Sequence, residues 1–153
     1  MSVFTFIDKI TEVKKNESLT AFFTLRGDEE FLLDHFSGFP VMPGVLEIES
    51  LKQAALSLLV FSGDYDKDFF RLAKVSDVKF GQFVKPGQMI RVFVELVRKE
   101  GMASVFNGRI DLAASESGEP TAKALSAELR LEPVRWTALE RREYIERLKQ
   151  STF

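Results

Sequence analysis

The sequence predicts an α+β fold in one domain, in which a single long buried helix accompanies a run of antiparallel strands. Three observations support this prediction. The chain has 153 residues, of which 45% are hydrophobic and 29% charged, the usual balance of one soluble domain. Residues 44–62 are apolar at three- and four-residue steps and almost all round, as in a fully buried helix. After residue 70, segments of strand character alternate with turn residues, which indicates consecutive antiparallel strands.

Each further element follows from its local pattern. Residues 3–13 and 19–26 alternate or are rich in β-forming residues and flank a polar turn, which predicts a hairpin. Residues 31–43 hold glycine and proline pairs without a sustained period, as expected of an ordered loop. Further strands are expected at 72–84, 89–99, 103–113 and 121–131, followed by a charged helix. We divide the chain into a domain at 1–131 and its C-terminal helical extension at 132–153.

Composition and charge argue against several classes of function. Cysteine is absent, which excludes a disulfide framework, a thiolate nucleophile and a thiolate metal site. The formal net charge is -2 and no long run of basic residues occurs, so nucleic acid is not an expected partner. The N-terminal segment alternates apolar and polar residues and carries charge from Asp8 onward, which fits neither a signal peptide nor a membrane span. We expect a cytoplasmic protein without a metal or a cofactor.

One stretch carries candidate chemistry, and it contains the only histidine of the chain, His35. Imidazole titrates near neutral pH and can take a proton from the carbon beside a thioester carbonyl. Backbone N–H groups at the start of the predicted helix, around Gly44 and Val45, can bind the charge that develops on the carbonyl oxygen. Glu49 lies more than one turn into this helix, where desolvation raises the pKa of a carboxyl. Gln53 lies four residues later on the same face and can hold that carboxyl.

Two features of this stretch have plainer interpretations as well. Glu47 points about 200° away from Glu49 on a helical wheel, so the two carboxylates cannot both face one pocket. A single histidine is by itself most simply a hydrogen-bonded structural residue. The 15 phenylalanines are interpreted as core and dimer packing, with an acyl-chain tunnel as the alternative.

The stretch at 35–54 resembles the signature of the 3-hydroxyacyl-[acyl-carrier-protein] dehydratases of fatty acid synthesis, the FabZ-type family. That signature reads His-Phe-x-Gly-x-Pro-x-Met-Pro-Gly-x-Leu, followed by an acid and then Gln-Ala. The match covers about ten positions and the 14-residue gap from His35 to Glu49. Weaker likeness extends over 6–10, 78–80 and 84–87, whereas the tail from about residue 132 has no counterpart. Three positions depart from the family pattern: Ser37, Phe39 and Glu47, the last of which replaces a residue that is usually apolar.

The resemblance implies a hotdog fold, in which a curled antiparallel sheet wraps around the long helix, in a homodimer or a trimer of dimers. It implies that His35 of one subunit acts as the base and Glu49 of its partner as the acid. The amide of Gly44 would bind the thioester carbonyl, and the other expected substrate contacts are Val45, Gln53, Phe36 and Pro43. The implied reaction removes water from a (3R)-hydroxyacyl thioester, carried by acyl carrier protein or coenzyme A, to give a trans-2-enoyl thioester.

Two alternatives share the implied fold. One is a non-catalytic hotdog subunit that binds an acyl carrier protein or an active homologue. The other is a thioesterase that hydrolyses its substrate with a carboxylate and water. The spacing of His35 and Glu49 argues against the thioesterase, and an activity assay separates the enzyme from the non-catalytic subunit.

Overall fold

The computed structural model describes residues 5–28, 40–63, 69–134 and 138–150, which form one antiparallel sheet and two helices. In chain order the elements are β1 (Lys9–Lys14), β2 (Ser18–Thr24), α1 (Gly44–Phe61), β3 (Phe69–Phe80), β4 (Met89–Glu100), β5 (Ala103–Ala113), β6 (Pro120–Val134) and α2 (Ala138–Gln150). The six strands lie in the order β1-β2-β4-β5-β6-β3, and every neighbouring pair is antiparallel. The α+β class predicted from the sequence is therefore confirmed.

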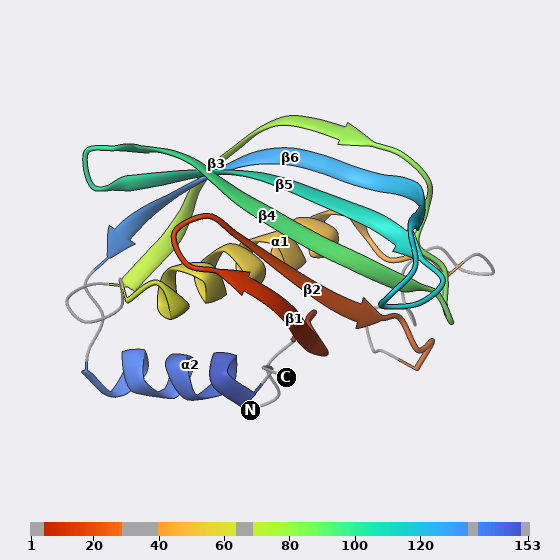
Figure 1. Cartoon of the computed structure of the whole chain (residues 1–153), viewed down its shortest axis with the longest axis horizontal. Coiled ribbons are helices and arrows are strands. Elements are labelled where there is room, and N and C mark those ends of the chain that lie inside the picture. The colour runs from red at the N-terminus through yellow and green to blue at the C-terminus, as the bar shows by residue number, and fades with distance from the viewer. Residues whose placement is uncertain (1–4, 29–39, 64–68, 135–137, 151–153) are drawn as a thin grey trace.

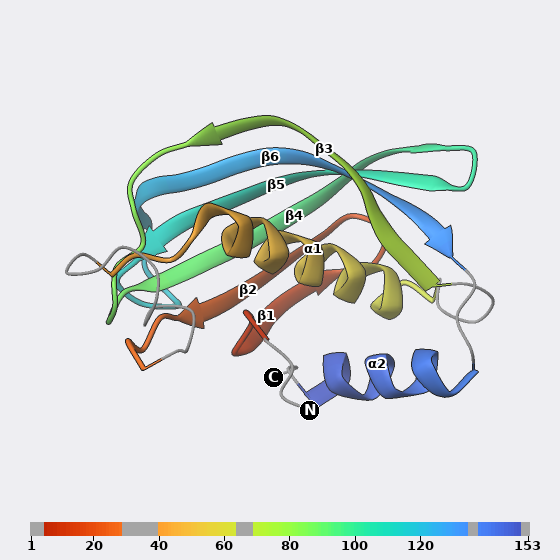
Figure 2. The ribbon, with the colours of Figure 1, turned by 180° about the vertical axis from the view of Figure 1, so that it is seen from behind.

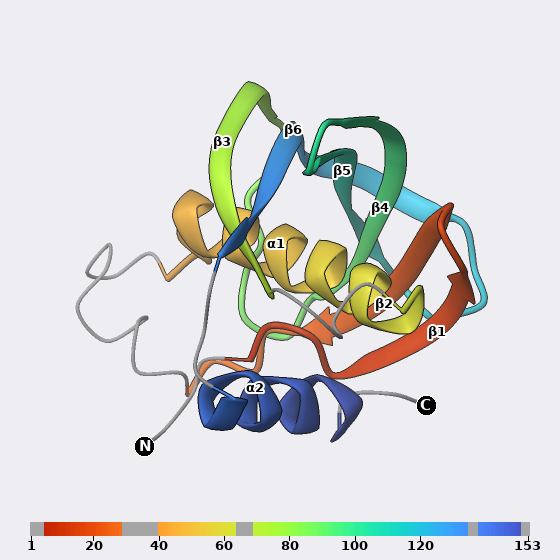
Figure 3. The ribbon, with the colours of Figure 1, turned by 90° about the vertical axis from the view of Figure 1, so that its left-hand side faces the viewer.

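The sheet curls around α1, which lies along its concave face (Figures 1 and 2). Viewed from the side, the strands arch over α1, while α2 lies outside the sheet (Figure 3). The core between helix and sheet consists of fully buried aliphatic and aromatic side chains, among them Leu51, Leu58, Phe106 and Leu129. This arrangement is the hotdog fold that the family resemblance implies.

Helix α1 approaches the sheet closely because β5 has a glycine beneath it. A Cβ atom at Gly108 would lie 2.9 Å from both δ-methyl groups of Leu51, closer than real side chains come. The helix face turned to the sheet carries the buried side chains of Glu47, Leu51, Ala54 and Leu58, which recur at three- and four-residue steps. Val45 and Glu49, on the other side of the helix, stay exposed or half-buried. The packing of Leu51 thus decides which face of α1 remains open.

The first strand is shorter than the sequence predicts, because the N-terminal segment pairs with side chains of α1. The Phe6 N–H donates to Gln53 Oε1 at 2.8 Å, and Ser50 Oγ donates to the Phe6 carbonyl at 3.2 Å. These bonds satisfy the backbone of Phe6 without a neighbouring strand, and β1 begins only at Lys9. None of the helices in the described ranges is long and apolar enough to cross a membrane.

Candidate active site

The start of α1 presents unused backbone donors. Pro43 occupies the N-cap with extended backbone angles (φ -61°, ψ 141°) and gives no side-chain cap. The N–H groups of Leu46 and Glu47 donate to the Pro43 carbonyl, whereas the amides of Gly44 and Val45 have no partner among the described residues. Orphan N–H groups at a helix start form an anion-binding site, since the helix dipole also favours negative charge there.

Two neighbours fix this helix start in place. The N–H of Met42, a residue that is 1% exposed, donates to the Val84 carbonyl at 2.8 Å, which ties the segment before α1 to the chain that follows β3. On the other side, the ring of Phe80 lies so close to Gly44 that a Cβ atom there would be 2.7 Å from Phe80 Cε1. A glycine at position 44 therefore keeps the backbone beside Phe80 accessible.

Apolar side chains surround these donors. Val45 is 73% exposed and Phe80 is 65% exposed, and Val78, two residues before Phe80 on the edge strand β3, is 37% exposed. We refer to Val45, Val78 and Phe80 as the entrance patch. Exposed apolar groups gathered around a polar centre are typical of a ligand site or an interface.

Glu49 lies on the open face of α1, one helical turn after Val45, and its two carboxylate oxygens differ. Oε1 is 3.3 Å from Lys52 Nζ, and the two side chains are 31% and 30% exposed. Oε2 is buried and has no hydrogen-bond partner in the described parts of the chain. The described partner of this carboxyl is Lys52, whereas Gln53, which was expected to hold it, accepts the Phe6 N–H at Oε1; contact between Gln53 and Glu49 stays a prediction.

The most deeply buried acid of α1 is Glu47, which replaces a usually apolar residue of the family signature. Glu47 is 4% exposed, and its Oε1 lacks a hydrogen-bond partner within the described residues. Burial raises the pKa of this carboxyl from 4.5 to about 8, which keeps it mostly protonated at neutral pH. The two carboxylates point to opposite faces, as the helical wheel predicts: Glu47 toward the sheet and Glu49 away from it.

Not all of the expected site residues can be placed. His35 and Phe36 lie outside the described residues, so the pairing of His35 with Glu49 stays a prediction. Gly44, Val45 and Pro43 come together at the helix start, and Gln53 lies farther along the same helix. Across the described segments, no group of three or more His, Asp or Glu side chains could hold a metal ion.

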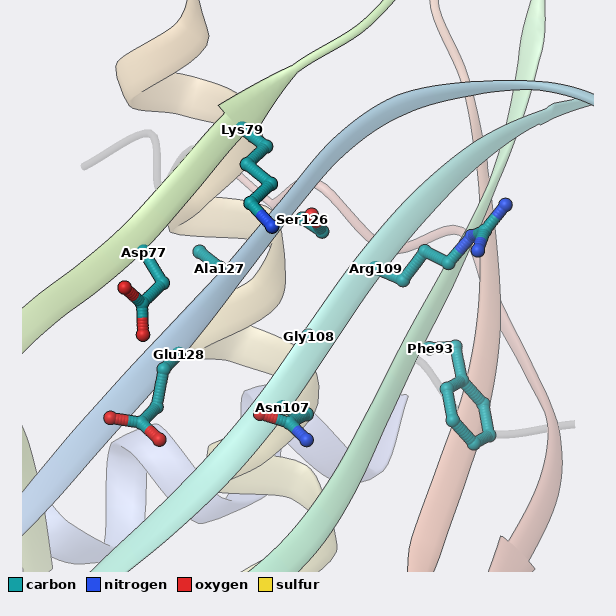
Figure 4. Close-up of a pocket in the computed structure, with 9 residues that line it drawn as sticks. All are labelled: Asp77, Lys79, Phe93, Asn107, Gly108, Arg109, Ser126, Ala127 and Glu128. Atoms are coloured by element: carbon teal, nitrogen blue, oxygen red, sulfur yellow. The ribbon is translucent and has the colours of Figure 1, made fainter.

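A separate groove of about 370 Å³ lies on the face of the sheet away from α1 (Figure 4). Its lining comes from β3, β4, β5 and β6 and comprises Asp77, Lys79, Phe93, Asn107, Gly108, Arg109, Ser126, Ala127 and Glu128. Ser76 Oγ donates to Glu128, which also lies 3.6 Å from Arg98, and Arg109 is paired with Asp111. Because Glu128 and Arg109 each have a partner of opposite charge and the groove lies across the sheet from the motif, we place the candidate site at the start of α1.

Two contributors were not identified as site residues from the sequence. Lys52 is three residues after Glu49, a spacing at which helical side chains meet, so the ion pair could have been predicted from the sequence. Phe80 belongs to the Val78-Lys79-Phe80 segment that resembles the family, but its approach to Gly44 depends on how β3 passes the helix.

Comparisons with known proteins identify the family to which the chain is similar. Residues 1–117 match the family model of the FabA-like domain. A 3-hydroxyacyl-[acyl-carrier-protein] dehydratase FabZ of Levilactobacillus brevis is 39% identical over 94 residues, which cover 61% of this chain and 64% of that protein. The FabZ of Polynucleobacter necessarius is 34% identical over 122 residues, which cover 79% of this chain and 78% of its own. The chain thus spans slightly less than two thirds of the Levilactobacillus protein.

Solved structures support the fold. A chain of the dehydratase heterocomplex ApeI:P from Xenorhabdus doucetiae superposes with a TM-score of 0.60 at 18% identity, covering 78% of this chain and 91% of that chain. A second structure, smu.793 from Streptococcus mutans bound to acetyl CoA, gives a TM-score of 0.60 at 13% identity and covers 88% and 93% of the two chains. At these identities the likeness concerns the fold alone.

Proposed function

We propose that this chain, which belongs to the FabA-like family and is related to the FabZ dehydratases, removes water from a (3R)-hydroxyacyl thioester. His35 takes a proton from C2, the bond between C3 and the hydroxyl oxygen breaks, and Glu49 gives its proton to the departing hydroxyl. The products are a trans-2-enoyl thioester and water. The acyl group is carried by an acyl carrier protein, as in the names of the FabZ relatives.

The observation that carries this proposal is the buried Oε2 of Glu49, which has no partner in the described structure. A buried carboxylate oxygen without a hydrogen bond is unfavourable for stability, and such unsatisfied groups call for an explanation such as a catalytic role. Glu49 follows Val45 by four residues, so its side chain lies on the same helix face as the Val45 amide, about 6 Å along the axis. The hydroxyl oxygen of the substrate is three bonds from its carbonyl carbon, which spans a comparable distance once a hydrogen bond is added at each end.

The carbonyl of the substrate is bound at the helix start. The amides of Gly44 and Val45, which no described residue bonds, donate to its oxygen, and the charge that develops there as C2 loses its proton is favoured by the helix dipole. Backbone donors of this kind need no rearrangement during the reaction. The acyl chain passes over the entrance patch, whose exposed Val45 and Phe80 supply apolar contact.

The site is completed by a second copy of the chain. The open face of α1 and the edge strand β3 lie next to each other at Gly44 and Phe80, and the entrance patch makes this corner apolar. A 12-residue edge strand is a template for pairing with another strand. In a two-fold dimer that pairs the two β3 strands, His35 of one subunit and Glu49 of the other act in the same site.

The test uses purified protein with a 3-hydroxybutyryl thioester of acyl carrier protein, and the appearance of the enoyl absorbance is followed. We expect turnover that His35→Ala and Glu49→Gln each abolish, with partial recovery when the two inactive proteins are mixed. Glu95→Gln, at an exposed carboxyl of β4, serves as the control and keeps wild-type activity. Turnover that survives Glu49→Gln would overturn the assignment of the acid.

A second candidate function is a non-catalytic subunit that binds an active homologue or an acyl carrier protein. The observation in its favour is that the ApeI:P structure is described as a dehydratase heterocomplex. This function predicts that the purified chain binds the acyl carrier protein without turnover and gains activity only when an active homologue is added. The same assay therefore separates the two candidates.

A further inference from the structure

We propose that Lys52 is a positioning residue for Glu49, which fixes the orientation of its carboxyl group and stabilises the negative charge left there when the proton is transferred. The proposal rests on the dehydration proposed above. It adds a residue for which neither the sequence motif nor the comparisons give a role.

The geometry of the Lys52–Glu49 pair indicates that Lys52 orients the Glu49 carboxyl. Lys52 follows Glu49 by three residues on one helix face, and its ammonium group contacts Oε1 at 3.3 Å. The other oxygen, Oε2, is directed into a buried position where no described group bonds it. A carboxyl anchored at one oxygen has a defined position for the second, so Lys52 determines where both oxygens of Glu49 lie.

Burial makes this ion pair more than a surface contact. Exposed ion pairs contribute little, because water screens them and two long side chains lose freedom. Here both side chains are less than a third exposed in the single chain. They lie on the face of α1 that the sheet leaves open, and a second subunit on this face would exclude more water and strengthen their interaction.

The charge balance of the reaction makes the effect specific to the transition state. The ion pair is the state of the free enzyme, and Glu49 takes up a proton from solvent before it reacts; as the C3–O bond breaks, this proton moves to the departing hydroxyl and the carboxylate forms again beside Lys52. An ammonium group beside this carboxylate interacts with it more strongly as that charge develops. Stabilisation that grows in the transition state raises kcat and leaves KM largely unchanged.

The experiment compares Lys52→Met, which keeps the length and apolar stem, with Lys52→Arg, which restores the charge. We expect Lys52→Met to lower kcat about tenfold with less than about a twofold change in KM, and Lys52→Arg to recover most of the loss. Lys14→Met, at an exposed position of β1, is the matched control and keeps both constants. A Lys52→Met enzyme with wild-type kcat, or one in which only KM changes, overturns the proposal.

A second measurement does not depend on activity. A double-mutant cycle combines Lys52→Met with Glu49→Gln and measures the free energy of unfolding by urea at low and high salt. Coupling that weakens with salt demonstrates the ion pair even if the chain proves to be a non-catalytic subunit, and that result would refute only the proposed dehydration. Absence of coupling refutes the role of Lys52 whatever the activity is.

Discussion

Replacing the buried acid of α1 by its neutral isostere, Glu47→Gln, tests the electrostatics of the core. In the unfolded chain Glu47 loses its proton near pH 4.5, whereas burial in the folded chain raises the pKa to about 8. The folded state therefore holds the extra proton between these values, and its stability is fully present below about pH 4.5, falls as the pH rises, and reaches its minimum above about pH 8. At 1.36 kcal/mol per pH unit, the whole interval corresponds to roughly 5 kcal/mol.

The assay is urea unfolding of wild type and variant at constant ionic strength between pH 5 and pH 9. Glutamine carries no charge at any of these pH values, so the free energy of unfolding of the variant should rise relative to that of the wild type as the pH rises. The difference due to ionisation of Glu47 should be under about 1 kcal/mol at pH 5, about 3 kcal/mol at pH 7 and about 5 kcal/mol above pH 8. Glu95→Gln, at an exposed carboxyl, should show no such trend. A constant difference between Glu47→Gln and wild type over this range would refute the reasoning, because only ionisation of a buried group gives the slope.

Three further substitutions test the packing around α1 and β3, each by urea unfolding. Gly81→Ala should lower the free energy of unfolding by more than about 3 kcal/mol, because its Cβ would lie 2.1 Å from a backbone carbonyl oxygen of β6 that cannot move without breaking the sheet. Wild-type stability of this variant would contradict the contact. Gly108→Ala should cost about 1 to 3 kcal/mol, since the Leu51 side chain can shift partway, and no loss would mean that the helix lies farther from β5. Gln53→Ala should cost about 1 to 2 kcal/mol and speed amide exchange at Phe6, whose N–H loses its acceptor, and unchanged exchange would exclude that bond.

The elements of the fold could be predicted because their local signals agree with the packing. The helix from residue 44 was expected to end at residue 62 and ends at Phe61, where the apolar period gives way to Ser62 and Gly63. The turns after β3 and β4 fall at Gly87 and Gly101, which have positive φ values of 88° and 63°. Glycine adopts such angles without strain, so these turns have a sequence signal that does not depend on tertiary structure.

The orientation of α1 could not be predicted to the same degree. Its residues are apolar almost all round, so the pattern does not indicate which face meets the sheet. Which face meets the sheet depends on the contact between Leu51 and Gly108 of β5, two residues that lie far apart in the sequence. Once this face is fixed, Glu47 is buried and Glu49 is half-buried, a difference that a helix apolar almost all round does not indicate.

The partners of polar side chains were also decided by tertiary structure. Gln53 and Lys52 are both within reach of Glu49 along a helix, at four and three residues. In the structure Lys52 Nζ contacts the Glu49 carboxylate, and Gln53 Oε1 accepts the N–H of Phe6 from the N-terminal segment. Spacing along one helix lists the candidate partners, but it does not indicate a bond to a backbone amide from a distant part of the chain.

The two acids of α1 separate the stability of the fold from the chemistry of the site. Glu47 faces the core and affects the free energy of unfolding, while Glu49 faces the open side, where substrate and a second subunit would meet it. Since the helix backbone lies between Glu47 and that side, the charge of Glu47 should not affect the reaction. The pH profile of kcat in Glu47→Gln should therefore match that of the wild type wherever both are folded, although their unfolding curves diverge. A shift in both measurements together would mean that the two carboxyl groups share one environment, and that the faces of α1 are not as independent as their burial indicates.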